Sequence, residues 1–353
     1  MTNNKTFAVM DAGAEEIFVL AASRSKNGDH TLEGFNRVPR AVSPGDKDGG
    51  LYPPAENVRE ALDGLSRKTG KRFHKVYAGI SSPSVKVISS SGSVLISRYG
   101  REVNFRDIRK CIDIGSLCRI PLDREVLHKI VTGFSVDGES PIRDPEGLEA
   151  MKLGVNVNML TINATTLGNM SRVISRAGYI PAGFVFSPFA CSFRVFAEED
   201  RMDRTAFIVP HRKRTEILLF SFGDLEDCKV LDRSIEDSAN TPGYSDADEK
   251  YGWLAEEITS MNGWRKMRRI VIPGARFPSE EFMRFMETTF GMPLRVGFPS
   301  ARPFEGLPED APGYAAALGI LDHLRNEAQG MSGRGSPAKR LFHQVAGFLD
   351  EYF

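Results

Sequence analysis

Two stretches of apolar residues, each interrupted by a short polar turn, occur 200 positions apart in the chain. Residues 7–20 read FAVMDAGAEEIFVL and residues 207–220 read FIVPHRKRTEILLF. Overlaid without a gap, they match phenylalanine with phenylalanine and Val9 with Val209. Short apolar runs rich in strand formers around a polar turn predict antiparallel strand pairs, and their recurrence predicts that one fold unit occurs twice.

Each unit continues in the same order, with a third strand, an amphipathic helix and a further strand. In the first unit these elements are expected at 34–39, 53–70 and 74–80, followed later by a helix at 165–178. In the second unit they are expected at 227–234, 252–263 and 269–274, followed by helices at 279–291 and 313–324. Strands that alternate with helices favour an α/β fold with two lobes that face one cleft.

Residues 84–163 interrupt the first unit with a different pattern. The run VKVISSSGSVLIS predicts a hairpin that turns at Ser91-Gly92, and NFRDIRKCIDIGSLC predicts a helix capped by Asn104. Two longer strands follow, LHKIVTGFSVD and LGVNVNMLTIN. We therefore expect an inserted α+β module between the strands and helices of the first lobe.

The C-terminus reads as a flexible linker, 327–336, and an amphipathic helix, 337–353. The helix follows a basic pair and carries one continuous apolar face: Lys339, Arg340, Leu341, Phe342, Val345, Phe348, Leu349, Tyr352 and Phe353. A helix that docks on its own domain or on a partner has the same pattern, but the preceding linker favours an interfacial membrane anchor. Asp350 and Glu351 cancel the basic pair, so binding would depend on apolar burial.

The amino-acid composition of the chain excludes several classes of function. The chain has 46 basic and 46 acidic residues among 353, so no global field attracts it to nucleic acid. Its four cysteines form no CxxC pair and have no histidine at ligand spacing, which predicts neither a metal site nor disulfides. Neither an apolar leader nor a run of about 18 apolar residues is present, so we expect a cytoplasmic protein.

The order of these elements, with the final YAAALGIL helix, resembles the actin-like ATP-binding superfamily. Within that superfamily, residues 93–196 resemble FtsA, the membrane-tethering protein of bacterial cell division, including its characteristic inserted subdomain. The pilus-assembly protein PilM carries the same insertion and is the alternative. The resemblance implies a duplicated, RNase H-like fold of two lobes. The outer subdomain of the second lobe is expected to be largely missing, because only about fifty residues separate Phe220 from Arg269. In its place, residues 234–251 read as an acidic, turn-rich loop.

In that family, ATP and Mg²⁺ lie between two phosphate-binding turns. The first turn resembles DIGTSK in the family and reads DAGAEE here, so Asp11 and Gly13 remain whereas Glu16 replaces the lysine. The second resembles DIGGGTTD and reads VPHRKRTE, in which only Thr215 and an acid, Glu216, remain. The pair of glycines on the adenosine side has become Gly274-Ala275. Because glycines and donors that phosphate needs are lost, we expect a vestigial nucleotide cleft, no bound cofactor and no ATP hydrolysis.

The basic run His211-Arg212-Lys213-Arg214 then has three interpretations. It is a solvated charged turn, or it still binds a phosphate, or it forms salt bridges across the cleft. For the last interpretation, Arg212, Lys213 and Arg214 would pair with Glu15 and Glu16 of the opposite turn. Nucleic-acid binding lacks support, because no aromatic residues or wider basic surface accompany the run.

The expected organisation divides the chain into six parts. They are the first lobe, 1–90; the FtsA-type insert, 91–163; the first lobe continued, 164–203; the second lobe, 204–326; the linker, 327–336; and the C-terminal helix, 337–353. The resemblance implies an FtsA-like adaptor on the inner face of the cytoplasmic membrane, acting at the septum with division proteins and capable of self-association. Binding of FtsZ is in doubt, because the missing outer subdomain holds the family's FtsZ groove. The alternatives are a PilM-like pilus adaptor and an active ATPase.

Overall fold

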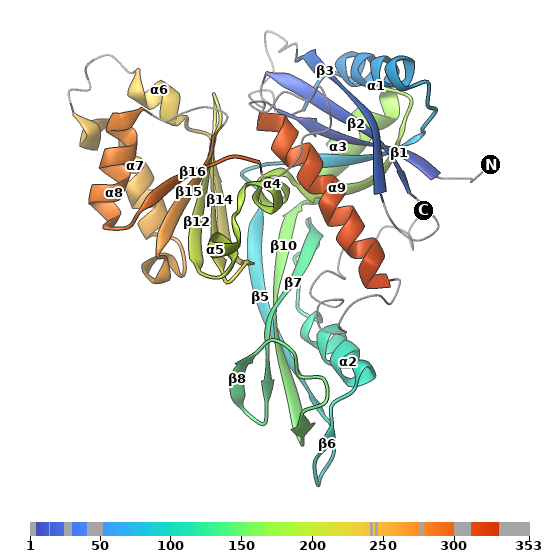
Figure 1. Cartoon of the computed structure of the whole chain (residues 1–353), viewed down its shortest axis with the longest axis vertical. Helices are drawn as coiled ribbons and strands as arrows, with labels where there is room; N and C mark the ends of the chain where they lie inside the picture. Colours follow the sequence, from blue (N-terminus) through green and yellow to red (C-terminus); the bar gives the residue numbers. More distant parts are fainter. Residues whose placement is uncertain are drawn as a thin grey trace.

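The computed structural model describes residues 5–13, 15–24, 30–40, 52–240, 243, 246–274, 279–299 and 312–331, and two five-stranded sheets dominate this part of the chain (Figure 1). The first sheet contains β1 (Lys5–Ala12), β2 (Glu16–Arg24), β3 (His30–Pro39), β4 (Lys75–Ile80) and β11 (Ile180–Phe186). The second contains β12 (Arg204–Pro210), β13 (Thr215–Ser221), β14 (Asp224–Leu231), β15 (Arg269–Pro273) and β16 (Leu294–Gly297).

The two sheets have the same topology. The first has the order β11-β4-β1-β2-β3 and the second has the order β16-β15-β12-β13-β14 when it is read in the same direction. In each, three consecutive strands form an antiparallel meander and two later strands run parallel to the first. The duplication expected from the sequence is confirmed, and the architecture is the two-lobed actin-like fold.

The strand ladders correct the ungapped overlay of the two units. The last pair before the turn is Ala12 with Ile17 in the first lobe and Pro210 with Thr215 in the second. Asp11 therefore corresponds to Val209, two positions away from the match of Val9 with Val209. A shift of two leaves every side chain on the same face of a strand, so the apolar pattern cannot distinguish the two registers.

Helices cover both lobes and explain the continuous apolar strands. Those of the first lobe are α1 (Ala55–Thr69), α3 (Ala164–Arg176), α4 (Ser187–Val195), α5 (Glu198–Arg201) and α9 (Pro312–Met331). Helix α9 was expected in the second lobe, 204–326, but it packs on α4, β1 and β2 of the first. Those of the second are α6 (Ile235–Ala239), α7 (Ala247–Thr259), the 3₁₀ helix η1 (Trp264–Lys266) and α8 (Glu280–Phe290). Met10 of β1 belongs to the same buried cluster as Leu62 of α1, whereas Val9 clusters with Ile320 of α9. Both faces of this sheet are thus buried.

The inserted module forms a four-stranded sheet of order β5-β10-β7-β8 with one helix (Figure 1). Its elements are β5 (Lys86–Leu95), β6 (Arg101–Glu102), α2 (Phe105–Gly115), β7 (Arg124–Val136), β8 (Glu139–Ile142), β9 (Glu149–Ala150) and β10 (Lys152–Asn163). The capping of α2 by Asn104 is confirmed, since its side chain accepts the N–H groups of Arg106 and Asp107.

The hairpin expected at Ser91-Gly92 is wrong, because β5 is a single strand of ten residues. Gly92 permits the close approach of α2 and does not form a turn: a Cβ on Gly92 would lie 2.5 Å from the backbone nitrogen of Gly115. The expected boundary between residues 90 and 91 also falls inside this strand.

The insert contacts the second lobe through polar groups. Asn158 Nδ2 of β10 donates to the carbonyl of Leu225 at 3.0 Å. Arg143 Nη2 donates to the carbonyl of Phe222 at 2.8 Å and lies 3.1 Å from Asp224 Oδ2. The insert thereby covers part of β14, the edge strand of the second sheet.

Two segments expected to be irregular contain helix. Residues 234–251, read as an acidic loop, include α6 and the start of α7, whose first turns are capped by the side chains of Ser234 and Asp246. Helix α9 continues to Met331, into the first residues of the expected linker. The remainder of the linker and the C-terminal helix lie outside the described residues.

Alanine at Gly92 should destabilise the protein by about 1–3 kcal/mol, because its methyl group would displace α2. Alanine at Gly168 is the matched control, since no atom lies within 4 Å of its added Cβ inside α3. This control should stabilise by about 0.5–1 kcal/mol. Urea denaturation of the two variants measures both effects, and equal effects would contradict the assigned role of Gly92.

Candidate functional site between the lobes

Two turns, one from each lobe, meet where the two sheets adjoin. One turn follows Ala12 of β1, and the other, residues 211–214, joins β12 to β13. Arg212 Nη1 lies 2.8 Å from Glu15 Oε1 across the junction. The N–H of His211 donates to the carbonyl of Arg214 at 2.9 Å, which closes the second turn. The acidic and basic turns therefore lie against each other.

Asp11 is buried at the carboxyl end of β1. Ser187 Oγ, at the start of α4, donates to Asp11 Oδ1 at 2.6 Å. A Cβ on Gly79 of the neighbouring strand β4 would collide with both atoms of this hydrogen bond, so the pair requires glycine there. Burial raises the pKa of Asp11 to about 6, although the Ser187 hydroxyl and the nearby His211 act in the opposite direction.

Glu216, at the start of β13, is the other buried carboxylate of this region, with 1% of its surface exposed. Ser81 Oγ of the first lobe donates to its Oε1, and His211 Nε2 lies 3.0 Å from its Oε2. Arg214 Nη1 donates to the carbonyl of Ser81 at 3.1 Å. We call Ser81, His211, Arg214 and Glu216 the inter-lobe lock, because its hydrogen bonds join the two lobes.

The lock determines the charge of Glu216. Burial raises the pKa of this carboxyl, but His211, the Ser81 hydroxyl and Arg214 together outweigh burial and hold the pKa below its ordinary value. Asp11 thus has a raised pKa and Glu216 a lowered one within the same junction. Only one of the two buried carboxylates is surrounded by enough compensating groups to favour its charged form.

The other expected site residues have different positions. Glu16 lies 3.8 Å from Arg37 of its own sheet, with both side chains about half exposed, and not against the second lobe. Lys213 is exposed, and its side chain forms no ion pair or hydrogen bond with the described part of the chain. Thr215 is buried, and its hydroxyl donates to the carbonyl of Arg233 at 2.8 Å.

Gly274, expected on the adenosine side of the cleft, packs against an aromatic ring. Its N–H donates to the carbonyl of Gly297 at 2.7 Å. A Cβ on Gly274 would lie 2.5 Å from the Phe298 ring, so this ring covers the glycine directly. Ala275, its neighbour in the expected pair, lies outside the described residues.

Several residues of this junction were not found from the sequence: Gly79, Ser81, Ser187 and Arg40. Arg40 stabilises the first turn with two hydrogen bonds. Its backbone N–H donates to the carbonyl of Glu15 at 2.6 Å, and its Nη1 donates to the carbonyl of Gly13 at 2.8 Å. One signal was available, because Ser81 and Ser187 directly follow the parallel strands β4 and β11. Carboxyl ends of parallel strands gather at one edge of a sheet, where Asp11 also lies.

Nothing can be said of the structure of the expected anchor residues, Lys339 to Phe353, because they lie outside the described part. Among the described helices, none combines the length and the apolar character needed to cross a membrane. No group of three or more histidine, cysteine or acidic side chains within the described residues is arranged to hold a metal ion.

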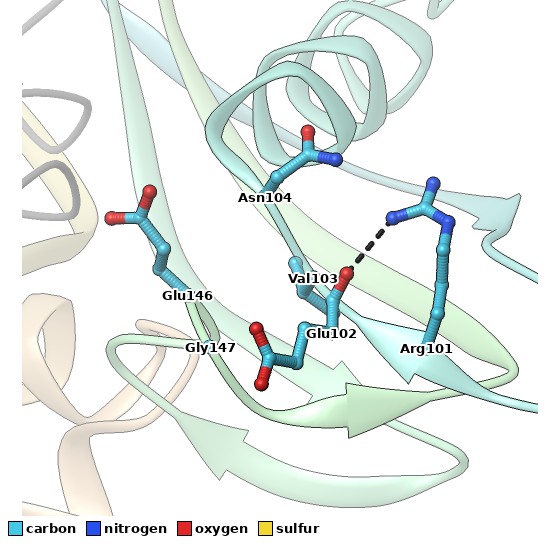
Figure 2. A pocket seen from close by; sticks show the side chains of 6 residues that line it. All are labelled: Arg101, Glu102, Val103, Asn104, Glu146 and Gly147. Atoms are coloured by element: carbon cyan, nitrogen blue, oxygen red, sulfur yellow. Dashed lines mark hydrogen bonds between the residues drawn. The ribbon is translucent and has the colours of Figure 1, made fainter.

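A hollow at the tip of the insert is lined by Arg101, Glu102, Val103, Asn104, Glu146 and Gly147 (Figure 2). Two of its polar side chains, those of Arg101 and Asn104, already have partners. Arg101 donates to both carboxylate oxygens of Asp107 at 2.7 Å and to the carbonyl of Glu102 at 2.8 Å, while Asn104 caps α2. Among the residues of this hollow, the sequence pointed only to Asn104, and as a helix cap.

Comparison with known proteins identifies the class first. Residues 83–161 match the model of the SHS2 domain inserted in FtsA. The solved PilM–PilN type IV pilus biogenesis complex has a similar fold, with a TM-score of 0.56 and 16% identity over 90% of this chain and 98% of that one. An actin-like protein with an SHS2 insert is therefore the class that the fold defines.

Sequence relatives give the particular resemblance, which is to the cell division protein FtsA. Identity is 23% with the Pseudomonas aeruginosa protein, covering 65% of this chain and 54% of the relative. Identity is 28% with the Borreliella burgdorferi protein, covering 61% of this chain and 52% of the relative. It is 30% with the Agrobacterium fabrum protein, covering 48% of this chain and 38% of the relative. The resemblance expected from the sequence is confirmed. The chain spans about half of the length of the curated relatives first compared.

Replacing Asp11 with asparagine should stabilise the protein above pH 6. Because the folded pKa of about 6 exceeds the ordinary 3.8, the folded state binds more protons than the unfolded state between these values, and stability falls as pH rises through this window. Such a shift corresponds to about 3 kcal/mol, and asparagine keeps an acceptor for Ser187 without the charge. Denaturation between pH 4 and 8 should show a gain that grows with pH, and a loss at pH 7.5 would contradict the assignment.

Replacing Glu216 with glutamine is the matched control, and its effect on stability should have the opposite sign. A lowered folded pKa stabilises the protein above the ordinary value of 4.5, and this contribution is lost as pH falls through the folded pKa. We expect Glu216→Gln to destabilise by about 1–3 kcal/mol at pH 7 and by less at pH 4.

Proposed function

We propose that this protein is an FtsA-like adaptor of bacterial cell division that joins its two lobes without nucleotide. The inter-lobe lock is the observation that carries the proposal. In the nucleotide-binding relatives implied by the sequence, the two turns hold phosphates between them. In this chain the same turns interact with each other through Arg212 and Glu15, and with Ser81 through Arg214 and Glu216.

The available donors support this proposal. A phosphate requires free N–H groups or cations at both turns. The N–H of His211 is bonded to Arg214, the Arg214 guanidinium to Ser81, and the Arg212 guanidinium to Glu15. The carboxylates of Glu15 and Glu216 would repel a phosphate placed between the turns. Lys213 is the exception, since it is exposed to solvent.

The lobes are joined by the buried part of the lock and by an apolar contact, in which Phe189 and Phe196 pack on Phe220. The Arg212–Glu15 pair is exposed, with 65% and 41% of the side chains accessible, and exposed pairs contribute roughly 0–1 kcal/mol. Glu216 is buried, so its hydrogen bonds are not screened by water. Hydrolysis of ATP is not part of the proposed function, because Glu16 replaces the lysine of the first turn and the second turn has lost its glycines.

The cellular role extends the same proposal. The curated relatives of this chain are cell division proteins. In addition, the sequence of residues 337–353 predicts a membrane-bound helix. The protein would therefore be peripheral on the inner face of the cytoplasmic membrane and link it to division proteins. Between β14 and β15 the described chain has α6, α7 and η1, so contacts with FtsZ would need another surface. A PilM-like pilus adaptor is the alternative, favoured by the fold similarity to the PilM–PilN complex.

Addition of ATP and Mg²⁺ should leave the melting temperature of the full chain unchanged. A ligand at 100 times its Kd stabilises by about 2.7 kcal/mol, which differential scanning fluorimetry detects readily. Arg214→Ala is the control variant: it should melt at a lower temperature than the wild type, equally with and without nucleotide. An upward shift of the wild type with ATP would contradict the proposal of a nucleotide-independent protein.

Liposome flotation tests membrane attachment. The full chain should float with the vesicles, whereas a chain ended after Met331 should stay at the bottom of the gradient. Phe348→Glu places a charge on the predicted apolar face and should reduce flotation several-fold. His343→Glu places the same charge on the opposite face and should have little effect, because that face would contact water. Equal flotation of full and shortened chains would remove the anchor from the proposal.

A further inference from the structure

One edge of strand β5 in the insert's sheet has no hydrogen-bonded partner strand among the described residues, although β14 of the second lobe contacts β5. The order β5-β10-β7-β8 places it at the edge, and its ladder to β10 runs from Lys86 to Leu95 without a register shift. Natural proteins protect such edges with charges, prolines, bulges or short strands. Here the strand has ten residues, no proline and only one charge, at Lys86. Such an edge can accept another strand.

The sequence of β5, KVISSSGSVL, indicates which strand could pair with this edge. It is nearly symmetric in chemical character about Ser91. An antiparallel pair of two such strands centred on Ser91 places like residues opposite each other: Val87 with Leu95, Ile88 with Val94, Ser89 with Ser93, and Ser90 with Gly92. Cross-strand pairs of matched apolar residues stabilise a sheet, and the small residues at the centre permit close approach. The strand is therefore suited to pair with itself.

We propose that two copies of this chain associate through antiparallel pairing of their β5 strands, with the two-fold axis at Ser91. The paired sheets would form one continuous sheet across the dimer, an isologous interface in which the same strand serves both partners. The strand would then have hydrogen bonds along both edges, which removes the unprotected edge from each copy.

The exposure of the strand agrees with this arrangement. Leu95 is 71% exposed although it is a large apolar residue, and Ser89, Ser91 and Ser93 on the same face are exposed as well. In the dimer, Leu95 would pack on Val87 of the second copy. Helix α2 lies on the other face, where Gly92 meets Gly115, and β14 lies on the face of Ser89, where Leu225 accepts a hydrogen bond from Asn158. Both therefore lie above or below the plane that the added strand would occupy.

The contact is small, so the dimer should dissociate on dilution. A single strand pair is smaller than the ~1,200 Å² of a standard stable interface. Sedimentation equilibrium of the full chain over a range of micromolar concentrations should therefore show a reversible monomer–dimer equilibrium. A protein that stays monomeric throughout this range would overturn the proposal.

Ser91→Lys should weaken the dimer at least tenfold, because it places two like charges opposite each other on the two-fold axis. Ser175→Lys introduces the same charge on the exposed surface of α3 and should leave the dissociation constant unchanged. Both positions are exposed, and circular dichroism melting verifies that both variants fold. A dimer that is unaffected by Ser91→Lys would also overturn the proposal.

Disulfide trapping tests the register independently of folding effects. In a Cys118→Ser background, since Cys118 is the one native cysteine not fully buried, Ser91→Cys should give a covalent dimer on mild oxidation because each residue lies opposite its own copy. Ser89→Cys alone should not, whereas Ser89→Cys together with Ser93→Cys should. Cross-linking of Ser89→Cys as efficient as that of Ser91→Cys would contradict the register, and absence of cross-linking from Ser91→Cys would contradict the pairing.

Discussion

The buried carboxylate of Glu216 is the constraint on which the arrangement of the two lobes depends. A buried charge is costly unless hydrogen bonds and opposite charges surround it. Its partners come from both lobes, Ser81 from the first and His211 from the second, so separating the lobes would expose or unpair it. Asp11, close by, has no cation at hydrogen-bond distance within the described part of the chain, and burial raises its pKa. Below about pH 6 the junction thus favours one charged carboxylate, not two.

The same logic extends to the insert. A further acid, Asp224, is partly buried; burial raises its pKa to about 7, although Arg143 of the insert acts in the opposite direction. With Asn158 and Leu225, this contact joins the SHS2 domain to the second lobe. The second lobe is thus held at one end by the inter-lobe lock and along β14 by the insert. Both contacts are polar, and they lie beside an apolar cluster that is continuous across the two lobes, in which Phe189 stacks on Phe220.

The elements of the fold were predictable because their apolar periodicity is local, as in FAVM and IFVL. The two-residue error in the overlay of the lobes arose because a strand has period two, so Val9 and Asp11 are equally compatible with Val209. Gly92 was misread because a glycine required for close packing has the same signature as one required for a turn. Ser81 and Ser187 escaped notice, since their roles depend on partners more than 100 residues away. Opposite charges on the two turns did suggest the Arg212–Glu15 contact.

Hydrogen exchange at the junction tests the central claim most directly. Amides of residues 79–82 and 209–216 should be protected in the protein without nucleotide, because the inter-lobe lock holds them. Protection should not change when ATP and Mg²⁺ are added, and it should fall in Glu216→Gln. Rapid exchange of these amides without nucleotide, followed by protection when ATP is added, would contradict the account, because the lobes would then be joined by the ligand.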